Sequence, residues 1–290
     1  MVCPVTFAVL HLVRPKQWLK NVLVVAAPLA AGALRTDHVA RDTLVAFVAF
    51  CLASSATYCL NDVLDAESDA THPVKRNRPI PSGAVPARTA LALSAVLAAA
   101  AVAVAFPGSL RLVVVLYLVI TALYSRFFKT QPVIELGLVS AGFILRAIAG
   151  GAATGVPLSQ WFLIVAGFGS LFMVTGKRLS ELTRAESSGA TTARASLAHY
   201  PLSYLRMILA ISASVTIAAY CLWAFDTAEG RPGAAWTTLS IVPFVLALLR
   251  YALDTDRGKV EEPEEVVLRD RTLLVLGLCW FVAYAVGVAL

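Results

Sequence analysis

Long apolar segments alternate with short polar ones along most of the chain. Nine of the apolar stretches approach the roughly 20 residues that an α-helix needs to cross a bilayer. They lie near residues 21–34, 43–60, 88–106, 110–125, 133–153, 158–176, 205–225, 235–251 and 272–290. The pattern predicts an all-α, polytopic membrane protein with nine transmembrane helices, in a single domain that spans residues 1–290.

Composition agrees with a membrane location. Hydrophobic residues make up 59% of the 290 residues and charged residues 14%, against about 45–50% and 25% in soluble domains. Most Lys and Arg residues lie in the N-terminal segment and in alternate loops, and basic residues gather on the cytoplasmic side of short loops. We therefore expect an integral inner-membrane protein with a cytoplasmic N-terminus, three long cytoplasmic loops and an external C-terminus.

The gathering of basic residues in cytoplasmic loops explains most of the net charge of +6, so the charge does not require a nucleic-acid partner. The four histidines show no metal-ligand spacing, which argues against a zinc site. Assembly into a homo-oligomer is compatible with the sequence, which does not determine the oligomeric state.

An acidic motif, NDVLDAESD, follows the second apolar stretch at residues 61–69. On a helix of about 3.6 residues per turn, Asn61, Asp62, Asp65 and Asp69 share one face, whereas Glu67 points to the opposite face. Three carboxylates on one face repel one another unless a cation lies among them, and hard oxygen ligands suit Mg²⁺ carried with a phosphorylated substrate. The alternative is a solvated acidic helix end with no ligand.

A basic segment comes directly after the acidic motif. Lys75, Arg76 and Arg78 follow within ten residues of Asp69, and three prolines between residues 73 and 81 stop the helix and turn the chain back. Because metal ions together with Lys and Arg bind diphosphate well, we expect a diphosphate ligand at this site. We also expect the loops that form the active site to be cytoplasmic. The alternative is that these cations only fix the topology.

These residues together resemble the intramembrane prenyltransferase superfamily typified by UbiA. Several further segments are similar to its branch of decaprenyl-phosphate phosphoribosyltransferases, and the resemblance extends from about residue 14 to residue 290. These segments are RPKQWLKN at 14–21, YSRFFK at 124–129, GKRLSEL at 176–182, SLAHYPLSYLR at 196–206, and PEE with DR between 263 and 271.

The loop after the sixth stretch departs from the superfamily pattern. Members that alkylate aromatic rings typically carry a second aspartate-rich motif there, whereas this chain has Lys177, Arg178, Glu181 and Arg184. On a helix, cations surround the one carboxylate, so this segment cannot form a second carboxylate–magnesium site but can bind a phosphate. The alternative is an ordinary basic helix end, whose surface ion pair contributes only about 0.3–0.5 kcal/mol.

The resemblance implies the reaction. Its donor is 5-phosphoribosyl 1-diphosphate, its acceptor is a membrane polyprenyl phosphate such as decaprenyl phosphate, and its product is a precursor of cell-wall arabinan. One carboxylate cluster and several basic ones suit these three anionic groups better than two carboxylate clusters would. The acceptor oxygen is already ionised at pH 7, so the reaction needs no general base.

The candidate residues fall into two groups. Those expected at the reacting centre are Asn61, Asp62, Asp65, Asp69, Tyr124 and Lys129, with Mg²⁺ held by Asp62, Asp65 and Asp69; Tyr124 and Lys129 match a Tyr/Lys pair of the family. Those expected to bind substrate are Arg14, Lys16, Lys20, Lys75, Arg76, Arg78, Arg146, Lys177, Arg178 and Glu181.

Two of these expectations leave alternatives open. Trp18, among the cations of the N-terminal segment, is either an interfacial anchor or part of a lipid-phosphate entrance. Arg146 lies in the middle of an apolar stretch, where a cation costs at least about 2.5–3.5 kcal/mol, so it must face protein, water or an anion. The neighbouring Gly142, Gly150 and Gly151 indicate close helix packing.

Two other functions are alternatives to the predicted phosphoribosyltransferase activity. An aromatic prenyltransferase of quinone or haem biosynthesis fits the first motif but not the basic second loop. A transporter would also have many spans, but transporters usually place charges near the midplane between inverted repeats, whereas this chain concentrates charge at the membrane edge.

Overall fold

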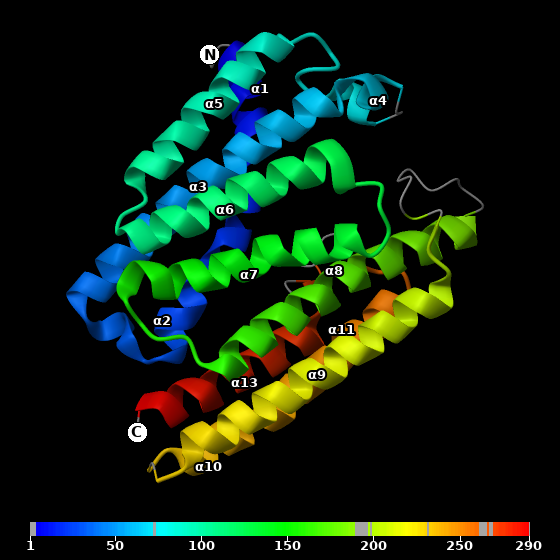
Figure 1. Ribbon diagram of the computed structural model, residues 1–290. Helices are drawn as coiled ribbons and strands as arrows, with labels where there is room; N and C mark the ends of the chain where they lie inside the picture. The colour runs from blue at the N-terminus through cyan, green and yellow to red at the C-terminus, as the bar shows by residue number, and fades with distance from the viewer. Residues whose placement is uncertain are drawn as a thin grey trace. The chain divides into compact units, whose positions relative to one another are not determined.

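Every regular element in the part of the chain that the structure describes is a helix, as predicted (Figure 1). The computed structural model describes residues 4–71, 74–188, 197, 199–230, 232–260, 266 and 269–289. The longer α-helices are α1 (Pro4–Val13), α3 (Asp37–Leu64), α5 (Ala87–Val104), α6 (Gly108–Leu123), α7 (Ile134–Thr154), α8 (Gln160–Ser188), α9 (Leu202–Ala228), α11 (Ile241–Asp256) and α13 (Arg271–Ala289). The shorter α-helices are α2 (Ala26–Ala30), α4 (Ala66–Ala70) and α10 (Ala234–Leu239).

Four segments have a different helical geometry. Three of them, η1 (Pro15–Val25), η2 (Ala33–Arg35) and η3 (Lys75–Asn77), are 3₁₀-helices, and η4 (Tyr124–Phe128) is a π-helix. Such segments are short in most proteins and often lie at functional sites. Here η1, η3 and η4 each carry, or directly precede, predicted site residues.

The chain folds into two compact units. Unit 1 contains residues 1–29, 33–129 and 145–157, and unit 2 contains residues 30–32, 130–144 and 158–290. Helix α7 therefore contributes its first half to unit 2 and its second half to unit 1. The expectation of a single domain over residues 1–290 stays a prediction.

The core of unit 1 is built around α3. This helix packs most extensively against α5 and also against η1 and α6. Its buried face is lined by small residues, among them Ala46, Ala49 and Ala53, which let neighbouring backbones approach closely, as is common between membrane helices. Phe50 fills the centre of this core and lies 5.1 Å from the ring of Tyr117 on α6.

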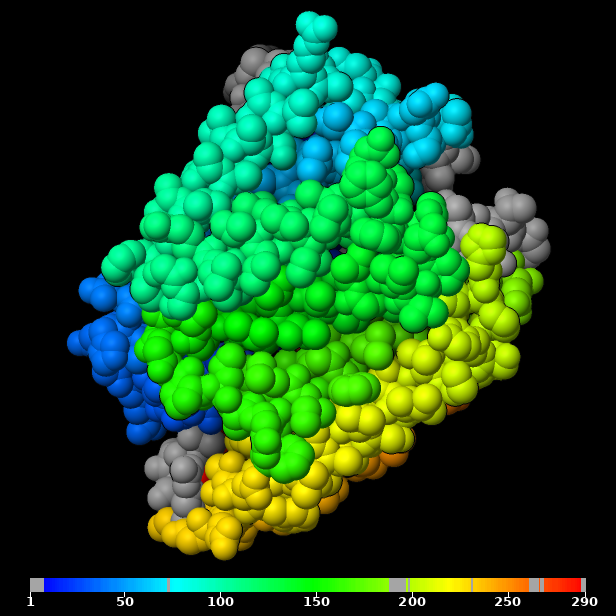
Figure 2. All heavy atoms as spheres, viewed as in Figure 1, coloured from blue at the N-terminus to red at the C-terminus, as the bar shows by residue number. Residues whose placement is uncertain are grey.

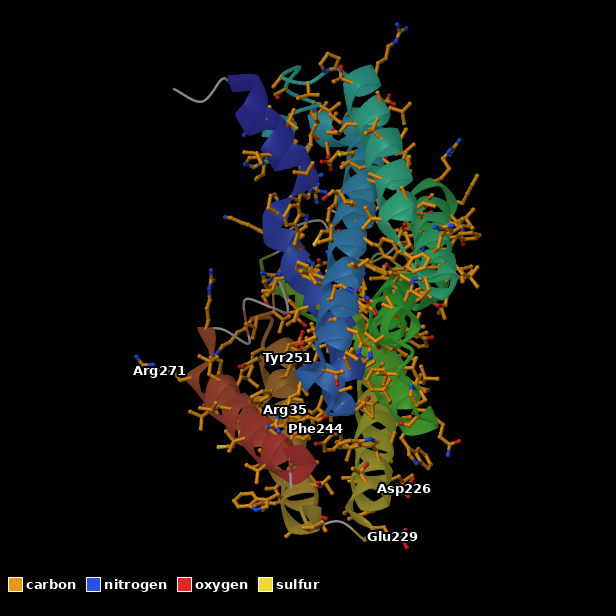
Figure 3. The ribbon with its side chains drawn as sticks, turned by 90° about the vertical axis from the view of Figure 1, so that its left-hand side faces the viewer. Arg35, Asp226, Glu229, Phe244, Tyr251 and Arg271 are labelled. Carbon is orange, nitrogen blue, oxygen red and sulfur yellow. The ribbon has the colours of Figure 1, made fainter. Side chains whose placement is uncertain are left out.

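Unit 2 is a bundle in which α8 packs along α9 and α11 packs along α13. Phe172 on α8 contacts Tyr251 on α11, with ring centroids 5.4 Å apart. Nearer the start of α11, Phe244 stacks on Tyr220, with ring centroids 4.0 Å apart. Figure 3 shows Phe244 and Tyr251 at separate points of this helix. Aromatic packing therefore joins the helices of unit 2 at two levels.

The predicted number of nine spans is not confirmed. Within the described residues, seven helical segments are long and apolar enough to cross a membrane. They are Asp37–Leu64, Ala87–Val104, Gly108–Phe128, Ile134–Thr154, Gln160–Ser187, Leu202–Ala228 and Ala234–Asp256. The last predicted stretch corresponds to a shorter apolar helix, Arg271–Gly287.

The first predicted stretch, residues 21–34, is not one helix. It contains the end of η1, the five-residue α2 and part of η2. Pro28 removes a backbone donor from α2, and Gly32 adopts a φ of 65°, a left-handed conformation that ends a helix. The stretch is apolar, as predicted, but these two residues interrupt its regular structure.

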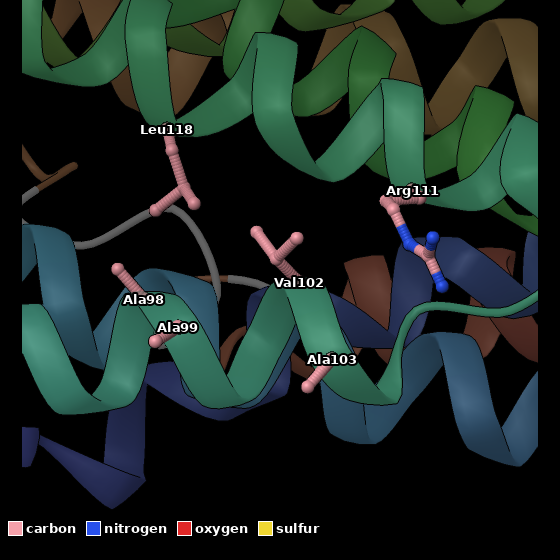
Figure 4. A pocket seen from close by; sticks show the side chains of 6 residues that line it. All are labelled: Ala98, Ala99, Val102, Ala103, Arg111 and Leu118. Atoms are coloured by element: carbon pink, nitrogen blue, oxygen red, sulfur yellow. The ribbon is translucent and has the colours of Figure 1, made fainter.

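Two open grooves lie on the units. In the space-filling view, α5 and α6 are seen at the surface of unit 1 (Figure 2), and a groove of about 640 Å³ runs between them (Figure 4). It is lined by Ala98, Ala99, Val102, Ala103, Arg111 and Leu118. A groove of about 410 Å³ in unit 2 lies between α7 and α8. Neither groove is lined by a predicted site residue.

Candidate active site

The acidic motif lies where α3 ends. The helix stops at Leu64, and α4 resumes at Ala66 after a single residue, Asp65, with φ −94° and ψ −3°. The motif is therefore nearly continuous helix, as predicted, with a slight break at its central carboxylate. Glu67 is exposed, which agrees with its predicted position on the opposite face.

Two carboxylates of the motif converge on one guanidinium. Asp62 and Asp69 are each only 2% exposed, and Nη1 of Arg78 lies 3.5 Å from Oδ1 of Asp62 and 2.6 Å from Oδ2 of Asp69. Arg14 donates from Nη2 to the same Oδ1 of Asp62 at 2.5 Å. Lys75 Nζ lies 3.7 Å from Oδ1 of Asp69. Each buried negative charge therefore has at least two cations beside it, as a buried charge requires.

Asp65 has partners of its own. Asn61 donates from Nδ2 to Oδ2 of Asp65 at 3.0 Å, and Lys129 forms an ion pair with Oδ1. Lys129 follows the π-helix η4, where its backbone N–H donates to the carbonyl oxygen of Tyr124 at 2.9 Å. In the part of the chain that the structure describes, no group of three or more Asp, Glu, His or Cys side chains is placed to hold a metal ion.

Arg14 reaches Asp62 from a strained backbone. Its φ of 49° and ψ of 62° are left-handed, which costs a non-glycine residue roughly 1–3 kcal/mol. The guanidinium also lies 5.2 Å from the centre of the Tyr58 ring. Nearby, Trp18 donates from Nε1 to Oγ of Ser55 at 3.0 Å. The indole thus bonds within the protein, which the sequence did not predict.

The remaining predicted cations of unit 1 are less tightly placed. Lys16 and Arg76 are exposed, and neither has a recorded hydrogen bond or ion pair with a residue that the structure describes. Lys20 is half-buried, as is Tyr124. The structure brings Arg14, Lys75, Arg78 and Lys129 to the carboxylates and does not bring Lys16 or Arg76 there.

Arg146 lies in the interior of unit 1 and is 5% exposed. Its Nε donates to Oδ1 of Asn21 at 2.8 Å, and its Nη2 donates to the hydroxyl of Tyr117 at 2.9 Å. The cation therefore faces protein, one of the environments that its position in an apolar stretch demanded. A substrate-binding role for Arg146 stays a prediction.

The basic segment of unit 2 contains a buried ion pair that the sequence analysis missed. Arg178 donates from Nε and Nη2 to the two carboxylate oxygens of Glu135, both at 2.9 Å, and the two side chains are 4% and 0% exposed. Glu181 lies 3.5 Å from Arg178, and Lys177 is half-buried. The signal for Glu135 was available, because it is a lone carboxylate at the start of an apolar stretch.

Tyr200 lies close to this pair. Its hydroxyl accepts a hydrogen bond from the backbone N–H of Val133 at 2.5 Å, and Val133 has a left-handed φ of 66°. Burial raises the pKa of Tyr200, opposed by the Val133 hydrogen bond. A β-branched residue in this conformation is a genuine outlier, so Tyr200 stabilises the backbone next to Glu135.

A third charged group links α11 to α13. Arg250 donates from Nη2 to Oδ2 of Asp270 at 2.6 Å, and Oδ1 of Asp270 accepts from the backbone N–H groups of Thr272 and Leu273. The Arg250 guanidinium holds the pKa of Asp270 well below its usual range. Asp270 is therefore an N-cap of α13. The PEE segment at 263–265, which carries part of the resemblance, lies outside the described residues.

Comparison with known proteins gives the context of this site. A profile of the UbiA prenyltransferase family matches residues 22–269. The chain is 47% identical over 287 residues to a decaprenyl-phosphate phosphoribosyltransferase of Mycobacterium tuberculosis, covering 97% of this chain and 94% of that protein. A decaprenyl-phosphate phosphoribosyltransferase of Corynebacterium glutamicum is 45% identical over 274 residues, covering 92% and 82%.

The fold agrees with these relationships. A UbiA homologue from Archaeoglobus fulgidus, solved with GPP and Mg²⁺, superposes with a TM-score of 0.72 at 18% identity, covering 97% of this chain and 98% of that one. At this identity the superposition shows a common fold alone. The residues matched by the family profile, 22–269, include the acidic motif at the end of α3. This integral membrane protein belongs to the UbiA prenyltransferase family.

Proposed function

We propose that this protein transfers the 5-phosphoribosyl group from 5-phosphoribosyl 1-diphosphate to a polyprenyl phosphate, such as decaprenyl phosphate. The product would be a polyprenylphosphoryl 5-phosphoribose, a precursor for cell-wall arabinan. The observation that carries this proposal is the 45–47% identity, over nearly the whole chain, to proteins named for this activity. The polar site in unit 1 supports it with suitable chemistry.

The carboxylate pair fits a divalent cation. Oxygens of Asp62 and Asp69 already converge on one positively charged atom, Nη1 of Arg78. Proteins commonly hold Mg²⁺ through one or two carboxylates, with substrate phosphates and water completing the shell. Asp62 and Asp69 would therefore hold Mg²⁺, with Asp65 beside them. Bound there, Mg²⁺ would neutralise charge on the diphosphate as it leaves.

The cations around the carboxylates suit the diphosphate. Arg14, Arg78 and Lys129 each pair with an aspartate, and a diphosphate offers these same donors additional anionic oxygens. The side chains of these cations remain 26–36% exposed, whereas the side chains of Asp62 and Asp69 are only 3% exposed. The cations can therefore reorient toward a ligand while the carboxylates stay in place.

The transfer itself requires little of the protein beyond charge. An oxygen of the lipid phosphate forms a bond to ribose C1, and the bond from C1 to the diphosphate oxygen breaks, so the diphosphate leaves with the electron pair. Positive character develops at C1 and negative charge on the leaving group, so stabilising that charge is the main catalytic task. Arg14, Arg78 and Lys129 would supply this stabilisation.

Two other anionic groups, the 5-phosphate and the lipid phosphate, need further cations. Lys177 is the candidate in unit 2, because Arg178 beside it is engaged in a buried pair with Glu135 and would act mainly by fixing this turn of α8. The exposed Lys16 and the half-buried Lys20, both in the N-terminal segment, are candidates for the lipid phosphate. The proposed orientation places the N-terminus and this site in the cytoplasm and the C-terminus outside.

Release of diphosphate tests this function directly. Purified protein should release diphosphate from 5-phosphoribosyl 1-diphosphate only when polyprenyl phosphate and Mg²⁺ are both present. Excess chelator should stop the release, and added Mg²⁺ should restore it. Full turnover in excess chelator would remove the metal from the proposal. Release of diphosphate from a prenyl diphosphate in the presence of an aromatic acid would replace the proposed reaction with an aromatic prenyl transfer.

A further inference from the structure

Helix η1 lies along α3 through a regular series of polar contacts. Arg14 bonds Asp62 at one end, and Trp18 bonds Ser55 in the middle. At the other end, Asn21 donates from Nδ2 to Oγ of Ser54 at 3.2 Å. We call Arg14, Trp18 and Asn21 the η1 ladder. A 3₁₀-helix rarely exceeds 3–4 residues because its hydrogen bonds are poorly aligned, so the 11 residues of η1 depend on this external support.

The far end of the ladder is fixed by α7. Asn21 is fully buried, and its Oδ1 accepts the hydrogen bond from Nε of Arg146. The Arg146 guanidinium is also bonded to Tyr117 and lies 4.8 Å from the centre of that ring. Both polar atoms of the Asn21 side-chain amide therefore form hydrogen bonds, because the oxygen accepts from Arg146 and the nitrogen donates to Ser54 on α3. An aspartate would lose the donor, and a leucine would lose both bonds.

Gly150, one turn beyond Arg146 on α7, makes the same end of η1 fit closely. A Cβ at this position would lie 2.0 Å from the carbonyl oxygen of Val24 and 2.9 Å from Cδ of Pro28. Backbone atoms cannot move aside cheaply at such a distance, so only glycine admits this approach. Arg146 and Gly150 therefore define where η1 ends, one by hydrogen bonds and the other by the absence of a side chain.

We propose that Arg146 and Gly150 are positioning residues, which act through Asn21 and η1 to place the guanidinium of Arg14 on Asp62. The strained backbone of Arg14 persists only while the surrounding structure holds it. If η1 is released at Asn21, Arg14 relaxes from its left-handed conformation and leaves Asp62. The catalytic consequence of this placement rests on the proposed function, whereas the placement itself does not.

Hydrogen exchange of the η1 backbone tests the placement without any substrate. Arg146→Gln removes the positive charge and part of the hydrogen bonding of this side chain. Gly150→Ala keeps Arg146 but displaces Val24. Both should raise amide exchange in residues 15–25 by roughly tenfold, the effect of one lost buried hydrogen bond. Ser94→Ala is the matched control, because it removes another buried tie to α3, from Ser94 Oγ to the carbonyl of Ala56 at 2.7 Å. It should change exchange in η1 by less than about twofold.

A double-mutant cycle with Arg14 tests the route. In the wild-type background, Arg146→Gln should lower kcat/KM for phosphoribosyl transfer by roughly tenfold, with Arg146→Lys intermediate. In an Arg14→Ala background the same change should have less than about a twofold effect, because its target is already absent. Equal effects in both backgrounds, or unchanged η1 exchange in both α7 variants, would overturn the proposal. If the wild type transferred no phosphoribosyl group, the proposed function would fail while the exchange result still judged the positioning.

Discussion

Arg78 is the residue on which the two buried carboxylates of the acidic motif depend most directly. Its single nitrogen Nη1 contacts both Asp62 and Asp69, which are almost fully buried. Without it, two negative charges would lie close together in a poorly hydrated site, where the loss of a compensating cation is costly. The position of Arg78 two residues beyond Arg76 offers an internal comparison.

We expect Arg78→Met to lower kcat/KM by roughly tenfold to a hundredfold, because a charge-assisted hydrogen bond contributes about 1.5–3 kcal/mol. Arg76→Met removes the same charge from an exposed side chain and should have much less effect. Steady-state kinetics of both variants with varied phosphoribosyl diphosphate would check this. Equal losses in the two variants would mean that net charge, and not the contact with Asp62 and Asp69, carries the effect.

The basic segment of unit 2 separates a structural role from a binding role. Arg178→Met leaves Glu135 buried without its bidentate partner, so it should destabilise the protein by about 3–5 kcal/mol. The double variant Glu135→Leu/Arg178→Met should recover much of that loss. Lys177→Gln, in contrast, should lower kcat/KM with little change in thermal stability. Thermal unfolding together with kinetics would distinguish these outcomes, and a Lys177→Gln variant with full efficiency would exclude it from phosphate binding.

At the residue scale, the sequence predicted several of the side chains that gather around the carboxylates, but not Lys16 or Arg76 correctly, and not how the gathered side chains pair. The face shared by Asp62 and Asp69, and the exposure of Glu67, follow from helical periodicity alone. The partner of Asp65 could not be predicted, because Lys129 lies 64 positions away and reaches it through tertiary packing. Arg178 was predicted to bind phosphate, but the pairing with Glu135 depends on the approach of α7 and α8, which no local pattern encodes.

At the element scale, the non-α segments determine where the site residues point. The π-helix η4 adds one residue to the end of α6, so the N–H of Lys129 bonds the carbonyl of Tyr124, five residues back. Such a bulge re-aims the residues that follow it. The periodicity that identifies apolar helices does not reveal such a bulge, and the apolar stretch predicted near residues 110–125 gave no sign of it.

Deletion of Arg126, an exposed residue within η4, should convert the bulge into regular α-helix. The N–H of Lys129 would then stand four residues after Tyr124, the spacing of an α-helical hydrogen bond, so Lys129 would keep its direction toward Asp65. We expect this variant, like Arg126→Ala, to stay near wild type in kcat/KM. Insertion of one alanine after Arg126 would instead rotate Lys129 by about 100° around the helix axis and should lower kcat/KM by at least roughly tenfold, the cost of one charge-assisted contact. Full activity in the insertion variant would show that the direction of Lys129 does not matter for the reaction.

The segment Pro15–Ala30, which overlaps the first apolar stretch, illustrates the same point about elements. Its 11 residues in η1 rise about 2.0 Å each, and the five in α2 rise about 1.5 Å each, so together they measure about 30 Å. That is the thickness of a bilayer core, reached with fewer residues than an α-helix needs. A count based on α-helical length therefore cannot decide whether this segment crosses the membrane.

At the scale of the whole molecule, the all-α fold and the membrane location follow from apolar length and composition, because a bilayer admits few other structures. The division into two compact units does not follow from sequence, since it depends on long-range packing. Sidedness follows only from the distribution of basic residues, and it can be tested at exposed positions on both sides. Figure 3 shows Glu229 near the end of α9, on the predicted external side.

Single cysteines introduced at Ser82, Ser187 and Asp256, in a cysteine-free background, should resist impermeant thiol reagents applied to intact cells. Each position is exposed in the structure, so the membrane alone would explain protection, and permeabilised cells should label at all three. Glu229→Cys should label from outside without permeabilisation. Labelling of Ser82→Cys in intact cells would place the acidic motif outside and reverse the proposed orientation.

The central claim is that the transferred group is a 5-phosphoribosyl group and that its acceptor is a lipid phosphate. Mass spectrometry of the lipid product, after incubation of the purified protein with polyprenyl phosphate, Mg²⁺ and phosphoribosyl diphosphate labelled in the ribose, measures this most directly. The account predicts a single labelled lipid whose mass exceeds that of the acceptor by one phosphoribosyl unit with its 5-phosphate retained, formed together with one equivalent of diphosphate. An unchanged lipid, or a prenylated aromatic acid formed from a prenyl diphosphate by the same protein, would contradict it.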